Sequence, residues 1–144
     1  AASEIEQYNR VALAVQPGIM ISGQTAADVV HLLAELIENA TLFSPQSTQV
    51  DVTAVGLASG GVLVEVRDDG VGVSPSRLAD MNLRLGRPPA ADEYIHRHMG
   101  LYVVSCLAAR HGIRVNLHAG TPQGLSAAVW LPPEISSFPR ATHP

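Results

Sequence analysis

The stretch that decides the fold is residues 31–40, which read His-Leu-Leu-Ala-Glu-Leu-Ile-Glu-Asn-Ala. Its apolar residues recur every three or four positions, and this spacing is typical of an amphipathic helix. The same spacing continues on both sides and predicts a helix over residues 25–43. Ser44-Pro45 then ends the helix, because a residue that precedes proline avoids the helical backbone conformation.

One face of this predicted helix is strongly polar. At ~100° per residue, Glu35 falls ~40° and Asn39 ~80° from His31, with Asp28 and Glu38 close by. The stripe holds no arginine that would relieve repulsion between the acids, and asparagine is a poor helix former. Carboxylate and amide oxygens on one face suit a hard cation such as Mg²⁺. Two interpretations remain open at this point, a solvated outer face and a cation site.

Alternating apolar residues around the helix predict strands that are joined mainly by tight turns, such as the one at Ser59-Gly60-Gly61. Hairpins dominate and helices are few, which predicts an α+β two-layer sandwich: a mostly antiparallel sheet with three helices on one face. The expected elements are strands at 10–15 and 19–22, the long helix, strands at 50–57 and 62–67, a helix at 74–85, a loop at 86–98, a helix at 100–111, and strands at 113–117 and 125–131.

The composition excludes several classes of function. The chain has 144 residues, 47% hydrophobic and 15% charged, which suits one globular domain. Its net charge of −4 argues against general nucleic-acid binding. All 9 of the Lys+Arg residues are arginines, so chemistry that needs a lysine is excluded. The single cysteine, Cys106, cannot form an internal disulfide, and no apolar run approaches the ~18 residues of a membrane-spanning helix.

A glycine-rich loop follows the second strand of the predicted hairpin and reads Asp68-Asp69-Gly70-Val71-Gly72. Such a run is common in plain turns. Two glycines so close also let the backbone approach a flat or charged ligand. An aspartate at the end of a strand can accept a hydrogen bond from an exocyclic amine, which is one way to select adenine.

Four short segments together resemble the boxes of the GHKL ATPases, and specifically those of sensor histidine kinases of the large actinobacterial type. Residues 31–40 resemble the N box, residues 68–72 the G1 box, and Met99-Gly100-Leu101 the end of the G2 box. Gly124-Leu125-Ser126, followed by Trp130-Leu131-Pro132, resembles the closing element. The resemblance covers about residues 10–133. We therefore expect a catalytic and ATP-binding domain at 1–133 and a C-terminal tail at 134–144 for which disorder is expected.

The resemblance implies a Bergerat fold that binds ATP and Mg²⁺ between the first long helix and a mobile lid. Asp68 would accept a hydrogen bond from the adenine amino group, with Ser126 near the adenine edge. Asn39 would ligate Mg²⁺ with help from Glu35. Further nucleotide contacts would come from the pocket wall at Gly70 and Gly72, from the N-terminus of the third helix at Met99, Gly100 and Leu101, where phosphate is favoured, and from Arg97.

Glu35 is also the expected catalytic residue. It stands where many sensor kinases carry asparagine, and in the gyrase-like and serine-kinase branches of the family an acid there orients or deprotonates the attacking nucleophile. The chain departs from the family pattern at two further places. His96 and His98 replace glycines of the G2 box, and Leu42 stands where relatives often carry a lysine. We therefore expect weak nucleotide affinity and a lid that is flexible without ligand, with arginines such as Arg97 supplying charge.

None of the six histidines has the setting of a phosphoacceptor, so the resemblance implies an upstream dimerisation domain that carries the acceptor. It also implies a response regulator as partner, no contact with nucleic acid or membrane, and a cytoplasmic place in a membrane-bound sensor. Two other interpretations stay open: an anti-sigma-factor-type serine kinase, and a degenerate nucleotide-binding or docking module without transfer activity. A gyrase-type ATPase is disfavoured because it needs a following domain with a catalytic lysine.

Overall fold

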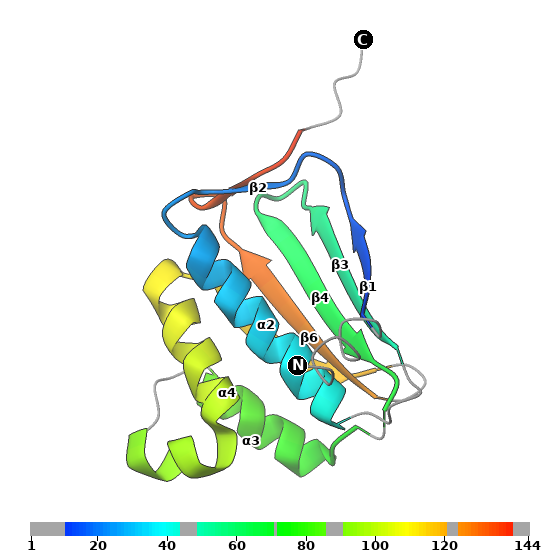
Figure 1. Ribbon diagram of the computed structural model, residues 1–144, viewed down its shortest axis with the longest axis vertical. Helices are drawn as coiled ribbons and strands as arrows, with labels where there is room; N and C mark the ends of the chain where they lie inside the picture. The colour runs from blue at the N-terminus through cyan, green and yellow to red at the C-terminus, as the bar shows by residue number, and fades with distance from the viewer. Residues whose placement is uncertain (1–10, 44–48, 71, 86–90, 121–123, 140–144) are drawn as a thin grey trace, which may run out of the picture.

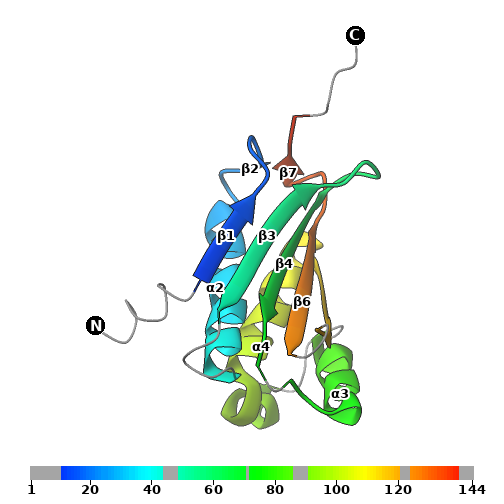
Figure 2. The same ribbon diagram turned by 90° about the vertical axis from the view of Figure 1, so that its right-hand side faces the viewer.

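A five-stranded sheet forms one layer of the molecule, and three helices cover one of its faces (Figures 1 and 2). The computed structural model describes residues 11–43, 49–70, 72–85, 91–120 and 124–139, with only the backbone at 41–43, 84 and 91–100. In sheet order the strands are β1 (Val11–Val15), β3 (Val50–Gly56), β4 (Val62–Asp68), β6 (Leu125–Leu131) and β5 (Arg114–Ala119). The helices are α2 (Ala26–Phe43), α3 (Pro75–Leu85) and α4 (Ala91–His111).

This architecture confirms the predicted α+β sandwich. The strand pairs β3–β4, β4–β6 and β5–β6 are antiparallel. The pair β1–β3 is parallel, which hairpin turns alone do not provide. Parallel neighbours need a crossover connection, and α2 provides it between β1 and β3. Among the described residues, no helix is both long enough and apolar enough to span a membrane.

The core lies between the sheet and the helices. Along β4 every second residue is buried, so that Val62, Val64 and Val66 face the helices and the remaining residues face outward. Helix α2 contributes a buried stripe at the expected spacing, with Leu32 fully buried. The other members of the stripe are Val29, Leu36 and Ala40. The helical periodicity of residues 31–40 is therefore used for packing on the sheet.

The ends of α2 and α4 are joined by one carboxylate. Asp28, in the first turn of α2, accepts a hydrogen bond from the Arg110 guanidinium at 3.0 Å. The same carboxylate oxygen lies 2.7 Å from Nε2 of His111. Asp28 therefore packs against the C-terminal end of α4 and serves helix packing. The partners of this acid, Arg110 and His111, come from a segment more than 80 residues away.

The loop predicted for residues 86–98 is wrong from Ala91 onward, because α4 begins there rather than at Gly100. Residues 91–99 contain neither glycine nor proline, so nothing in their backbone chemistry opposes a helix. They lack the apolar periodicity by which a helix is found in sequence. Residues 86–90 lie outside the described residues.

The domain also continues past residue 133, so the expected disordered tail is wrong for residues 134–139. A short strand there, β7 (Ser136–Ser137), pairs antiparallel with β2 (Met20–Ile21). The buried Ser136 hydroxyl donates to the carbonyl oxygen of Pro132 at 2.9 Å. Phe138 packs on Gly56, where a Cβ would collide with its ring. Residues 140–144 lie outside the described residues.

Candidate functional site

Asp68 is the most unusual side chain in the described structure, because it is a carboxylate in a row of buried apolar residues. It ends β4 in phase with Val66 and faces the helices, with 2% of its surface exposed. The N–H of Gly70 donates to its Oδ1 at 2.8 Å. The backbone N–H of Leu125 on β6 also donates to the carboxylate. The carboxylate is therefore held in one orientation by the loop that follows it and by the neighbouring strand.

Burial raises the pKa of Asp68 above its ordinary value, while the N–H donors of Gly70 and Leu125 act in the opposite direction. A nearby carboxylate, Asp69, raises the pKa further. Two N–H groups use only part of the accepting capacity of a carboxylate, which has about four lone-pair sites. The remaining capacity, on a buried carboxylate, suits a ligand that donates a hydrogen bond.

Two glycines let the loop after β4 pass very close to the start of β6. Gly72 has φ of 80°, and a Cβ there would lie 3.0 Å from the carbonyl oxygen of Gly124. Gly124 has φ of 93°, and a Cβ there would collide with the carbonyl oxygen of Asp68. The loop at 68–72 is therefore more than a plain turn, because its shape depends on a contact with a strand more than 50 residues away.

Ser126 does not share the face of the sheet on which Asp68 lies, and its expected place near the adenine edge stays a prediction. In the β4–β6 register Ser126 pairs with Arg67, whose side chain is on the opposite face of the sheet from Asp68. Leu125 is next in register and lies opposite Asp68. The hydroxyl of Ser126 is buried and has no hydrogen-bond partner among the described residues.

The polar stripe of α2 keeps the predicted order, with His31 and Glu38 exposed and Asn39 half-buried. His31 Nε2 lies 3.5 Å from Oε1 of Glu35, and 26% of the Glu35 side chain is exposed. Asn39 lies one turn beyond Glu35, toward the end of α2. The C-terminal end of α2 and the end of β4 lie at the same end of the molecule in both views (Figures 1 and 2).

The predicted phosphate-binding N–H groups are not at a helix N-terminus. Met99, Gly100 and Leu101 lie inside α4, which begins at Ala91, and Leu101 is part of the buried core. Backbone N–H groups inside an α-helix already bond carbonyl oxygens four residues earlier. In this conformation Gly100 and Leu101 therefore have no N–H groups to offer to phosphate. Arg97 lies in the same helix, and its side chain is outside the described part.

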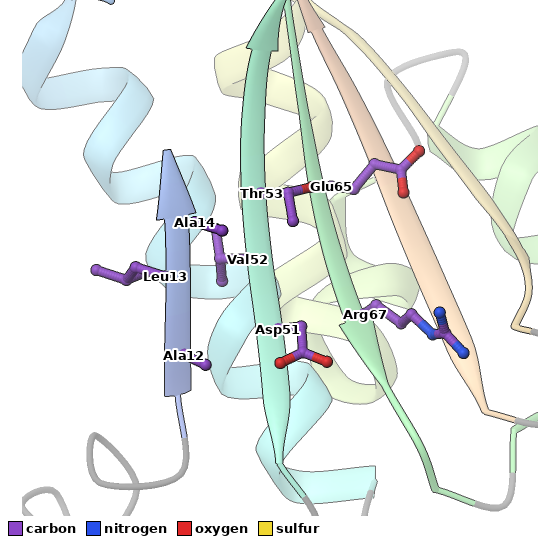
Figure 3. Close-up of a pocket in the computed structure, with 8 residues that line it drawn as sticks. All are labelled: Ala12, Leu13, Ala14, Asp51, Val52, Thr53, Glu65 and Arg67. Carbon is purple, nitrogen blue, oxygen red and sulfur yellow. The ribbon is translucent and has the colours of Figure 1, made fainter. Parts of the chain in front are cut away.

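No group of three or more His, Cys, Asp or Glu residues that could hold a metal occurs in the described part of the chain. A hollow of about 290 Å³ lies elsewhere, on the outer face of the sheet (Figure 3). Polar side chains point into it from β3 and β4, among them Asp51, Thr53 and Arg67. Asp68 and Asn39 do not line it. This hollow is therefore separate from the candidate site.

Sequence reasoning missed two contributors to the site, Gly124 and the backbone of Leu125. The sequence did carry a signal for the burial of Asp68, because continuing the alternation of β4 from Val62 puts Asp68 on the buried face. The register of β6 against β4 could not be predicted from the sequence, because a shift of one residue exchanges the faces on which Leu125 and Ser126 lie.

Known proteins similar to this chain belong to one family of ATPases. Residues 24–135 match the family described as histidine kinase-, DNA gyrase B-, and HSP90-like ATPase. Sensor protein QseC of Escherichia coli O157:H7 is 36% identical over 120 residues, 83% of this chain and 25% of QseC. Histidine protein kinase DivJ of Caulobacter vibrioides is 32% identical over 136 residues, 85% of this chain and 22% of DivJ.

The chain thus spans about a quarter of the length of these relatives. Among solved structures, full-length ShkA in complex with AMPPNP superposes with a TM-score of 0.71 at 23% identity. The superposition covers 97% of this chain and 29% of ShkA, and at this identity it shows the fold. With the family model matching residues 24–135, the chain belongs to the family of histidine kinase-, DNA gyrase B-, and HSP90-like ATPases.

Proposed function

We propose that this chain is the catalytic ATP-binding domain of a sensor histidine kinase and transfers the γ-phosphoryl group of ATP to a histidine on an upstream dimerisation domain. The observation that carries the proposal is the buried, oriented carboxylate of Asp68. A carboxylate in a row of core valines costs folding free energy, so its presence there calls for a ligand that uses it. The sensor kinases QseC and DivJ, which this chain resembles, support the same assignment.

The residues around Asp68 fit an adenine ring. The carboxylate would accept a hydrogen bond from the exocyclic amino group, and Gly70 would keep it in place from behind. Gly72 and Gly124 let the loop after β4 and the start of β6 pack against each other without side chains between them, so their backbones form a close wall beside Asp68. Leu125, rather than Ser126, is the residue of β6 on the ring's side of the sheet.

The residues that would hold Mg²⁺ are Asn39 and Glu35. They are four positions apart on α2 and so share one face of the helix, and both are half-buried. An amide oxygen and a carboxylate oxygen suit Mg²⁺, which completes its shell with water and phosphate oxygens. When bound, the cation supplies neutralisation of the phosphate charge, which matters in a chain without lysine.

Glu35 would also orient the attacking imidazole or accept its proton. Its contact with His31 at 3.5 Å shows that its carboxylate can reach an imidazole on the same side of the helix. General-base assistance of this kind contributes about 10²- to 10⁴-fold to the rate. The carboxylate of Glu35 takes up only the proton of the imidazole, while the phosphoryl group itself passes from ATP to the imidazole nitrogen.

The phosphate end of the site requires a rearrangement of α4. For Gly100 and Leu101 to offer N–H groups to phosphate, residues 91–99 must leave the helix that now precedes them. A helix that begins at Gly100 would then direct its N-terminus at the phosphates. Nucleotide binding is therefore expected to reduce the hydrogen-exchange protection of amides 95–101, a change that nuclear magnetic resonance can follow.

The wider setting follows from the same proposal. We place the domain on the cytoplasmic side of a membrane-bound sensor and expect a response regulator to receive the phosphoryl group from the acceptor histidine. Nucleic acid and the membrane itself are not expected to contact this domain. The net charge of −4 supports the expectation that nucleic acid does not bind, because the phosphate backbone of nucleic acid is itself negative.

The deciding experiment supplies radiolabelled ATP to a protein that contains this chain and its upstream dimerisation domain. The proposal expects a phosphoprotein whose label is lost in acid and kept in base, as for phosphohistidine, and no label in Asp68→Ala. Acid-stable phosphoserine would favour the serine-kinase alternative. Binding of a partner without binding of any adenine nucleotide would favour the docking module instead.

A further inference from the structure

Strand β1 forms an open edge of the main sheet. It is outermost in the strand order and pairs with β3 alone among the described strands. The opposite edge strand, β5, is covered by Asn82 of α3, whose side chain makes two hydrogen bonds of 2.7 Å to the backbone of Leu117. Open edges attract other strands, and proteins usually guard them with charges, prolines or bulges. The sequence of β1, Val-Ala-Leu-Ala-Val, has none of these guards.

The direction of each backbone group in β1 follows from one hydrogen bond. The N–H of Gln16 donates to the carbonyl oxygen of Ala54 on β3 at 2.9 Å. Backbone groups alternate between the two edges of a strand, so Ala12 and Ala14 also direct theirs at β3. The N–H and C=O groups of the odd-numbered residues therefore point to the open edge. These residues are Val11, Leu13 and Val15.

The side chains of the edge are apolar and exposed. Leu13 is 70% exposed and Val15 52% exposed. Figure 3 shows Leu13 projecting from β1 on the side away from β3. A leucine this exposed contributes little to the core of the monomer, so its burial would come from association with another surface.

We propose that β1 pairs with β1 of a second copy of this chain, antiparallel, about a two-fold axis through Leu13. The strand is a palindrome, Val-Ala-Leu-Ala-Val, so the axis places each residue opposite an identical or matching one. Val11 meets Val15 of the other copy, and Leu13 meets Leu13. These are the residues whose backbone groups face outward, so each opposed pair exchanges two N–H···O=C bonds.

The palindrome and the hydrogen-bonding register agree, and this agreement identifies a second copy as the partner. An axis placed one residue away, on Ala12 or Ala14, would oppose residues whose backbone groups are already bonded to β3. The uncharged strand brings no like charges together at the axis. The result is a continuous ten-stranded sheet, with the helices of both copies on the same face.

The test uses the whole 144-residue chain. Sedimentation equilibrium from about 10 μM to about 1 mM should show a reversible rise from monomer to dimer mass. Hydrogen exchange over the same range should show protection of the Leu13 amide that grows with concentration. The amides of Ala12 and Ala14, bonded to β3, should be equally protected at all concentrations.

Variants separate this edge from other surfaces. Leu13→Lys places two positive charges opposite each other and should raise the dimer dissociation constant at least about tenfold. Leu13→Pro removes an outward N–H without removing a bond to β3 and should act in the same direction. Leu83→Lys is the matched control, because Leu83 is 57% exposed on α3, and it should leave the dimer unchanged.

Three results would overturn the proposal. The chain could remain a monomer at the highest concentration, or its dimer could survive Leu13→Lys. The Leu13 amide could also be protected independently of concentration, which would mean that another part of the same chain covers the edge.

Discussion

Replacing Asp68 by asparagine should stabilise the ligand-free domain and weaken its binding of adenine nucleotides. The side chain is 2% exposed, and burial is the main reason that its pKa is raised. Asparagine has nearly the same shape, and its amide oxygen can still accept the hydrogen bond that Gly70 donates to Oδ1. The substitution therefore removes a buried charge without creating a cavity. It also turns part of the acceptor surface into an N–H donor that would face the amino group of adenine.

The loss of affinity can be estimated from the single hydrogen bond that is changed. A hydrogen bond to a charged group contributes about 1.5–3 kcal/mol. Removing the acceptor also leaves the amino group of adenine buried without a partner. This range corresponds to about a ten- to a hundredfold rise in the dissociation constant. Isothermal titration with Mg²⁺ and a non-hydrolysable ATP analogue measures it directly.

The gain in stability depends on pH in a defined direction. The pKa of Asp68 is higher in the folded chain than the value of 3.8 expected in the unfolded chain. The folded state therefore binds the proton more tightly, and the wild type loses stability as pH rises from 3.8 through the folded-state pKa. Asparagine does not titrate. The difference in unfolding free energy between variant and wild type should be smallest in acid and reach a constant maximum above the folded-state pKa.

Urea unfolding of both proteins across this pH range measures the difference. Asp69→Asn is the matched control, because Asp69 is the adjacent carboxylate with 48% of its side chain exposed. It should change neither the affinity nor the pH profile by a comparable amount. Equal nucleotide affinity of Asp68→Asn and wild type would refute the adenine assignment. A destabilised Asp68→Asn at neutral pH would refute the reasoning that the site is maintained at a cost to stability.

Three further substitutions test other parts of the structure. Asn82→Ala removes both hydrogen bonds to the backbone of Leu117, so the urea midpoint should fall by an amount equivalent to about 1–3 kcal/mol. An unchanged midpoint would mean that water replaces the side-chain amide as the partner of Leu117. Glu35→Gln keeps a side-chain oxygen that can still ligate Mg²⁺, so nucleotide affinity should fall much less than phosphoryl transfer, which should slow by about 10²- to 10⁴-fold; unchanged transfer would remove Glu35 from the mechanism. Phe138→Ala should lower the unfolding free energy by about 1–3 kcal/mol, because the ring is half-buried against Gly56. An unchanged unfolding free energy would mean that residues 134–139 do not stabilise the domain.

Much of the fold was predictable because it depends on local periodicity. The long helix, predicted at 25–43, is observed at Ala26–Phe43, and the hairpin strands agree within a residue at each end. The alternation of β4 fixes the burial of Asp68 without reference to any other segment. The start of α4 was not predictable in this way, because residues 91–99 carry no periodic apolar signal and no residue that breaks a helix.

The sequence by itself determined most of the elements and the polar stripe of α2, because a period of 2 or 3.6 residues is written into neighbouring positions. Only the tertiary structure decided that Leu125 rather than Ser126 faces Asp68, and that Asp28 is held by Arg110 and His111. These outcomes depend on strand register and on helix contacts between segments about 50 to 80 residues apart. A shift of one residue in a strand reverses which side chains face the site, and no local pattern records that choice.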